Sequence, residues 1–165
     1  MPDTPEFIAE RMQAEGAKTL AFFHTLTPRQ WEASVYTEGA LWTVRDVLAH
    51  FVAAESGITR LVEHILAGGD GAPEDFDLNA YNERKVNALR ETTLEELFEQ
   101  FSRYRQVSSS LVRGLSQEAL EKIGRHPWLG IATLREIVKL MYRHNQIHQR
   151  DIRKAFESGE RIQNG

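Results

Sequence analysis

The amino-acid sequence predicts an all-α protein, a bundle of four long helices. Apolar residues recur every three or four positions along four long segments, which is the period of an amphipathic helix. Capping residues stand at the starts of these segments, and glycine and proline stand between them. The sequence shows no convincing strand and no internal repeat of fixed length. Amphipathic helices bury their apolar faces against one another, so a four-helix bundle is the expected architecture.

Length and composition bound the class of protein. The chain has 165 residues, so we expect a single domain over residues 1–165. Its net charge of −4 offers no basic surface for nucleic acid. It contains no cysteine, which excludes disulfides and thiolate ligands and fits a cytoplasmic protein. No stretch approaches the roughly 18 apolar residues that a membrane span needs. We therefore expect a cytoplasmic protein with neither a membrane nor a nucleic-acid partner.

The first predicted helix spans residues 5–26. Thr4 can cap its N-terminus, and Pro5 suits the first helical position. The segment "LTPRQW" then restarts the helical pattern with Thr27 and Pro28. This short turn of helix would carry Trp31 into the core.

The second predicted helix spans residues 43–67. Thr43 can cap it, and Asp46 stands where a capping box needs its acidic residue. Three glycines end the helix and open a loop. The apolar stripe consists of Val47, Phe51, Ala54, Ile58, Leu61 and Ile65.

The third predicted helix spans residues 79–115, and "RETTLEEL" can break it, because Thr93 and Glu96 form a further capping box there. The fourth predicted helix spans residues 133–156. The links before these two helices are long enough for crossover connections, so periodicity alone does not fix the order of the helices. The expected inward stripe of the third helix is Leu94, Leu97, Phe101, Tyr104, Val107 and Leu111.

Two histidines interrupt the apolar stripe of the last helix, in the segment "LMYRHNQIHQRD". An unpaired buried imidazole costs about 1–3 kcal/mol, whereas leucine would stabilise the same position. The spacing of four places His144 and His148 on one face of the helix, with Cβ atoms about 5–6 Å apart. One divalent ion can be held from that geometry. The alternative is that hydrogen bonds within the bundle satisfy both rings.

A third histidine favours the metal site. His50 borders the inward stripe of the second predicted helix, and bundles build metal sites from side chains on facing helices. Three imidazoles with open coordination positions are typical of a catalytic site. We therefore predict that His50, His144 and His148 bind a divalent metal, zinc or nickel. Ligating histidines must be neutral, so metal affinity is expected to fall as the pH drops through about 6.5.

The remaining histidines and two tryptophans receive structural assignments. His24, His64 and His126 are assigned to packing or capping, although His126 also precedes the last helix closely enough to border a pocket. Trp42 and Trp128 are assigned to the core or to a lid. The sequence shows no nucleophile elbow and no phosphate-binding loop. A bound metal ion is therefore the source of reactivity that the sequence indicates. Catalytic residues are not assigned.

Two of these segments carry a resemblance to a known family. "LWTVRDVLAHFVAAE" resembles the second-helix signature of the DinB/YfiT-like superfamily, and "HPWLGIATLREIVKLMYRHNQIHQRDI" resembles its fourth helix with the lead-in. The resemblance implies a bundle of up-down-down-up connectivity and a divalent metal held by His50, His144 and His148. Asp151 stands where members of the family often have glutamine. It either orients the ring of His148 or is a solvated or salt-bridged charge.

The resemblance also implies candidate functions. The segment "YNERKVNALRETTLEELFEQF" is similar to the third-helix region of members related to mycothiol-dependent enzymes, such as maleylpyruvate isomerase. Relatives transfer mycothiol, bacillithiol or glutathione, so a metal-dependent thiol S-transferase or isomerase acting on a small electrophile is expected, with the thiol as cosubstrate. Two alternatives stay open: a metal-dependent hydrolase, and a non-catalytic, metal-stabilised bundle that binds a small molecule or a protein partner in stress response. The family further implies a homodimer.

Overall fold

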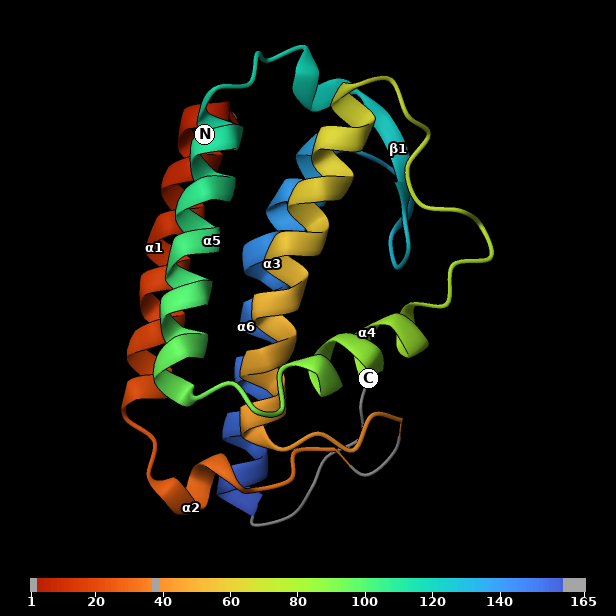
Figure 1. Cartoon of the computed structure of the whole chain (residues 1–165). Coiled ribbons are helices and arrows are strands. Elements are labelled where there is room, and N and C mark those ends of the chain that lie inside the picture. The colour runs from red at the N-terminus through yellow and green to blue at the C-terminus, as the bar shows by residue number, and fades with distance from the viewer. Residues whose placement is uncertain (1–2, 37–38, 159–165) are drawn as a thin grey trace.

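The computed structural model describes residues 3–36 and 39–158, and four long helices dominate it (Figure 1). Their bounds lie within two residues of the predicted ones, except in the third predicted helix. The long helices are α1 (Pro5–His24), α3 (Val44–Leu66), α5 (Leu94–Arg113) and α6 (Leu134–Ser158). The shorter elements are α2 (Pro28–Trp31), α4 (Leu78–Ala88), the 3₁₀ turn η1 (Ala119–Glu121), β1 (Ile123–His126) and β2 (Gly130–Thr133).

The connectivity of the bundle is up-down-down-up, as the family resemblance implied. In Figure 1, α1 and α6 run from the top of the view to the bottom, whereas α3 and α5 run from the bottom to the top. Helix α1 packs against α5 and α6, and α3 packs against the same two helices. The chain between the parallel helices α3 and α5 must return along the whole bundle, and α4 lies within this return segment (Figure 1).

Side-chain caps explain where the helices begin. The Thr4 hydroxyl accepts a hydrogen bond from the backbone N–H of Phe7. Thr43 and Thr93 each form a complete capping box with the acidic residue three positions later. The capping box of Thr27 begins α2, and Trp31 is buried and stacked on Phe23. Each cap satisfies backbone donors that the first turn of a helix leaves unpaired, so these predictions are confirmed.

The third predicted helix, over residues 79–115, is divided into two helices, as the capping box within it allowed. The chain forms α4 and then α5, and the break falls within the "RETTLEEL" segment that the capping signal marked. The predicted stripe of α5 was partly wrong, because Val107 is 55% exposed, whereas Arg105 and Ser108 are buried. The inward face of α5 follows the order Leu97, Phe101, Arg105, Ser108, Val112, in which a charge takes a core position.

The structure also contains a hairpin that the sequence did not predict. Strands β1 and β2 pair antiparallel, with Ile123 opposite Thr133 and His126 opposite Gly130. Each strand has only four residues, which is too short for alternation to stand out against the background. Gly130 has a φ of 76°, a conformation that glycine adopts without steric cost.

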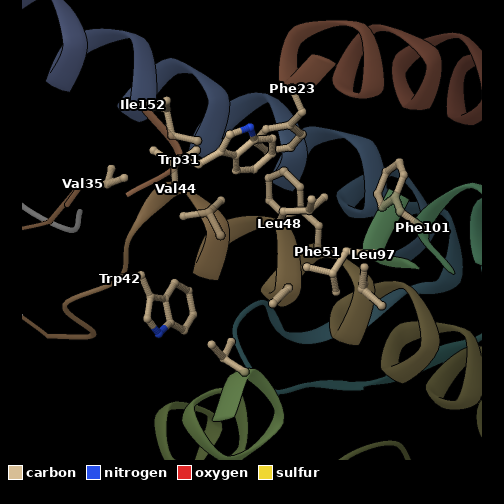
Figure 2. Close-up of a cluster of buried hydrophobic side chains, with 14 of the residues drawn as sticks. Phe23, Trp31, Val35, Trp42, Val44, Leu48, Phe51, Leu97, Phe101 and Ile152 are labelled. Atoms are coloured by element: carbon tan, nitrogen blue, oxygen red, sulfur yellow. The ribbon is translucent and has the colours of Figure 1, made fainter. Parts of the chain in front are cut away.

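The core consists of two apolar clusters, one toward each end of the bundle. Figure 2 shows the first, in which Phe23, Trp31, Leu48, Phe51 and Phe101 lie close to one another. The second cluster contains Ile8, Met12, Val62, Ile65, Leu134 and Ile137. None of the helices within the described ranges is long and apolar enough to cross a membrane.

A layer of buried polar side chains separates the two clusters. Along each of the four long helices, the residues between the clusters include polar ones that are buried. We call this set the polar layer; it comprises Thr19, Glu55, Arg105, Ser108, Asn145 and Gln149. His144 and His148 lie beside Asn145 and Gln149 on α6, whereas His50 lies on α3 next to Phe51 of the first cluster. The candidate site therefore lies where the polar layer meets the first apolar cluster.

Candidate metal centre

The three predicted ligands come together, although they are distant in the sequence. His50 comes from α3, and His144 and His148 come from successive turns of α6. The ring centroid of His50 lies 4.6 Å from that of His144 and 5.4 Å from that of His148, and the two α6 rings are 4.7 Å apart. One ring nitrogen from each residue can be chosen so that all three lie within 4.8 Å of one another. The sequence-based grouping of these histidines therefore holds in three dimensions.

Aromatic side chains wall the cluster on the side of the first apolar cluster. The ring of Phe51 lies 5.5 Å from that of His144 and 5.7 Å from that of His148. The ring of Trp42 lies 4.7 Å from that of His50, and Trp42 is buried at the edge of the cluster shown in Figure 2. His50 is 5% exposed, whereas His144 and His148 are half-buried.

Burial keeps all three imidazoles neutral. It lowers the pKa of His50 and of His144 well below the ordinary value, and the neighbouring imidazoles lower both further. Burial lowers the pKa of His148 to about 4, although the charge of Asp151 acts in the opposite direction. A neutral imidazole has the lone pair that a metal ion requires. The pH at which protonation would begin to weaken metal binding therefore lies below the value of about 6.5 expected from the sequence.

The donor set fits a divalent metal. The Nε2 atoms of His50 and His144 are 2.8 Å apart. Two nitrogens bound to one tetrahedral zinc ion are separated by about 3.3 Å, so this pair would have to move apart by only about 0.5 Å. Neutral imidazoles suit zinc, nickel and similar ions better than they suit calcium or magnesium. These three residues could hold such an ion with coordination positions left for a substrate.

Tyr36 and Asp151 extend the site behind His148. The Tyr36 hydroxyl lies 2.5 Å from Nδ1 of His148 and donates a hydrogen bond of 2.9 Å to Asp151. Asp151 is 7% exposed, so the interpretation as a solvated charge was wrong. Its ion pair, with Arg150 at 3.6 Å, lies within α6. Burial and the negative charge of Asp151 raise the pKa of the Tyr36 hydroxyl. Sequence reasoning missed Tyr36, because it lies in a loop without periodicity.

The polar layer supports the site from the other side. The guanidinium of Arg105 donates to both carboxylate oxygens of Glu55, at 2.5 and 3.0 Å. It also donates to the Asn145 side chain at 2.6 Å and to the backbone carbonyls of Met12 and Met141. One side chain thus links α1, α3, α5 and α6 next to His144. Sequence reasoning missed Arg105, although its spacing of four from Phe101 was a usable signal.

The other histidines have structural roles. The ring of His24 stacks on that of Phe98 at 4.2 Å. Nδ1 of His126 accepts hydrogen bonds from the backbone N–H groups of Trp128 and Leu129, so His126 caps the turn of the hairpin. His64 lies beside Gly69, away from the three-histidine cluster. Trp128 itself is exposed, so of the two tryptophans only Trp42 packs into the core.

The lowered histidine pKa values predict how stability depends on pH. In the metal-free protein, the free energy of unfolding is expected to fall as the pH is lowered from about 6.5 toward 4. Above pH 6.5 both states hold neutral histidines; below it, the unfolded chain, with a histidine pKa of about 6.5, binds protons that the folded protein excludes. His148 and His126, whose folded pKa values are about 4, contribute throughout this range.

Urea denaturation at a series of pH values, in the presence of a chelator, measures this dependence. The His148→Gln variant should show a shallower slope between pH 6.5 and 4. A stability that stays constant or rises over that interval would contradict the prediction.

Comparisons with known proteins agree with the fold. A family model, described as the DinB superfamily, matches residues 9–152. The structure is similar to that of YfiT from Bacillus subtilis, with a TM-score of 0.76. YfiT is described as a probable metal-dependent hydrolase with an unusual four-helix bundle topology. The two share 19% sequence identity, and the match covers 94% of this chain and 88% of YfiT. The colibactin self-resistance protein ClbS, solved in complex with double-stranded DNA, superposes with a TM-score of 0.66 at 14% identity, over 95% of this chain and 98% of ClbS. No curated protein matches the sequence significantly.

Proposed function

The chain belongs to the DinB superfamily, and on that basis we propose that it is a divalent-metal-binding enzyme that activates a small nucleophile. The observation that carries this proposal is the convergence of His50, His144 and His148 as neutral imidazoles. Zinc or nickel is the proposed metal. When bound, the ion would supply the positive charge that lowers the pKa of a water or a thiol beside it.

The proposed reaction is transfer of a low-molecular-weight thiol to a small electrophile, or a thiol-assisted isomerisation. The resemblance of the third-helix region to mycothiol-dependent relatives supports this choice. In the transfer, the sulfur forms a bond to the electrophilic carbon, the leaving group departs with its electron pair, and the thiol proton passes to solvent. The chain's own residues supply the apolar wall of Phe51 and Trp42, which would exclude water from one side of the reacting groups.

Hydrolysis is the second candidate, and it is favoured by the similarity of the fold to YfiT. The two reactions differ in the nucleophile, which is a thiol in the transfer and a water molecule in the hydrolysis. A third candidate is a bundle that binds metal without catalysis. We propose a small molecule as the substrate and no nucleic-acid partner, since the net charge of the chain is −4.

One experiment separates the three candidates. Metal-free protein is loaded with Zn²⁺ or Ni²⁺ and its metal content is measured. Thiols paired with electrophiles, and a panel of esters and amides without thiol, are then tested with loaded protein, with metal-free protein and with the His144→Ala variant. Turnover that requires both metal and thiol supports transfer, and turnover that requires metal alone supports hydrolysis. Stoichiometric metal without turnover supports the binding protein, and absence of metal uptake overturns the proposal.

A two-fold homodimer remains a proposal from the family resemblance. We expect analytical ultracentrifugation at micromolar concentration to show a species of twice the 18.9 kDa chain mass. A single species at 18.9 kDa would contradict it.

A further inference from the structure

We propose that Tyr36 is a positioning residue that sets the tautomer of His148 and leaves its Nε2 free for the metal. The inference deepens the proposed function and rests on it, because His148 matters here as a metal ligand. It adds one residue, from a loop far from α6 in the sequence, whose role follows from the hydrogen bonds that it makes.

The directions of the hydrogen bonds determine which ring nitrogen of His148 carries the proton. A tyrosine hydroxyl has one proton to donate, and Tyr36 donates it to the Asp151 carboxylate at 2.9 Å. The same oxygen lies 2.5 Å from Nδ1 of His148, and only its lone pairs remain for that contact. Nδ1 must therefore carry the proton. A neutral imidazole has a single N–H, so Nε2 of His148 is left with its lone pair.

The opposite tautomer would cost a buried hydrogen bond, although Asp151 would keep its ion pair with Arg150 at 3.6 Å. With the proton on Nε2, Nδ1 and the Tyr36 oxygen would face each other with lone pairs only. Tyr36 could turn its proton to Nδ1, but Asp151 would then lose this buried partner. Tyr36 is fully buried and Asp151 is 7% exposed, so bulk water cannot readily replace either contact, and a buried unsatisfied group is costly.

The loop that carries Tyr36 is anchored next to the other helix of the site. The N–H of Val35 donates to the carbonyl of Trp42, and the N–H of Val44 donates to the carbonyl of Ala33, both at 3.0 Å. These bonds hold the loop against the start of α3, the helix that carries His50. Tyr36 thus connects the N-terminal end of α3 to His148 on α6.

Some residues do not bind the metal themselves but hydrogen-bond to a ligating histidine and fix its orientation and tautomer. Mutation of such a residue typically lowers the metal affinity by about 10- to 100-fold. The Tyr36→Phe variant keeps the aromatic ring and removes only the hydroxyl. We expect its affinity for Zn²⁺ to fall by about 10- to 100-fold. Tyr142→Phe is the matched control, because Tyr142 is also buried but lies in the second apolar cluster.

The tautomer of His148 is determined by NMR of the ring nitrogens in metal-free protein that contains ¹⁵N-labelled histidine. Zn²⁺ affinity is measured by competition with a chelating indicator, and stability by urea denaturation. In the wild type, we expect the proton of His148 on Nδ1. Tyr36→Phe and Asp151→Ala should shift the proton toward Nε2, whereas Asp151→Asn, which retains an acceptor oxygen, should preserve the tautomer. A merely structural role would lower stability in Tyr36→Phe without moving the tautomer.

The outcomes separate this inference from the metal proposal. If wild-type protein takes up no Zn²⁺, the proposed function fails, whereas the tautomer is still decided in the metal-free protein. A proton on Nε2 of His148 in the wild type overturns the inference. So does an unchanged tautomer in Tyr36→Phe; if that variant does not fold, an unchanged tautomer in Asp151→Ala has the same consequence.

Discussion

Replacing His148 by alanine is expected to abolish stoichiometric binding of Zn²⁺ or Ni²⁺. The substitution removes one of three converging imidazoles and leaves two, which hold a divalent ion too weakly to retain it through dialysis at micromolar protein concentration. His148 is half-buried, so the helical fold should persist. Elemental analysis after dialysis, together with titration calorimetry of metal-free protein, measures the loss.

His64→Ala is the control for this substitution, because His64 lies on α3, as His50 does, but near the C-terminal end of the helix and away from the cluster. It should bind metal as the wild type does. Retention of one equivalent of metal by His148→Ala, with unchanged affinity, would show that the ion is held elsewhere.

Replacing Arg105 by alanine is expected to destabilise the folded protein by about 3–5 kcal/mol, which is typical when one partner of a buried ion pair is removed. Arg105 and Glu55 are each 2% exposed, so the substitution would leave the carboxylate of Glu55 buried without its partner cation. The Asn145 side chain and two backbone carbonyls would also lose a donor. Urea denaturation monitored by far-UV circular dichroism measures the change.

Arg103→Ala is the matched control on the same helix. Its guanidinium is exposed and lies 4.0 Å from Glu99, so its removal should change stability by no more than about 0.5 kcal/mol. A double-mutant cycle of Arg105→Leu and Glu55→Leu should give a coupling energy of about 1–3 kcal/mol. A loss below about 1 kcal/mol in Arg105→Ala would mean that water enters and solvates Glu55.

The helices could be predicted because their signals are local. Thr43 and Thr93 place helix starts through hydrogen bonds to residues three positions away, and the apolar period marks the length that follows. The hairpin could not be predicted in the same way. Its Gly124 packs against the side chain of Ile65 on α3 so closely that a Cβ would clash, and a contact across 59 residues has no local signature.

The residues of the candidate site also differ in whether a local sequence signal marks them. His144 and His148 were recognisable because they interrupt an apolar stripe at a spacing that metal sites use, and His50 because it borders the facing stripe. Tyr36 was not, because it reaches His148 through tertiary folding alone. Arg105 is buried, and charged residues are rarely buried. A stripe assigned from apolar residues alone therefore includes Val107 and omits Arg105.

The polar layer has a consequence for how the helices can slide. Two purely apolar helix faces can slip past each other by one turn, about 5.4 Å, and still bury similar surface. Such a slip of α6 would carry Asn145 and the carbonyl of Met141 away from Arg105, while the guanidinium stayed with Glu55. A single buried polar contact is known to select one register among several apolar ones. The contacts of Arg105 therefore fix the axial register of α3 and α6. This register keeps His50 on α3 opposite His144 and His148 on α6.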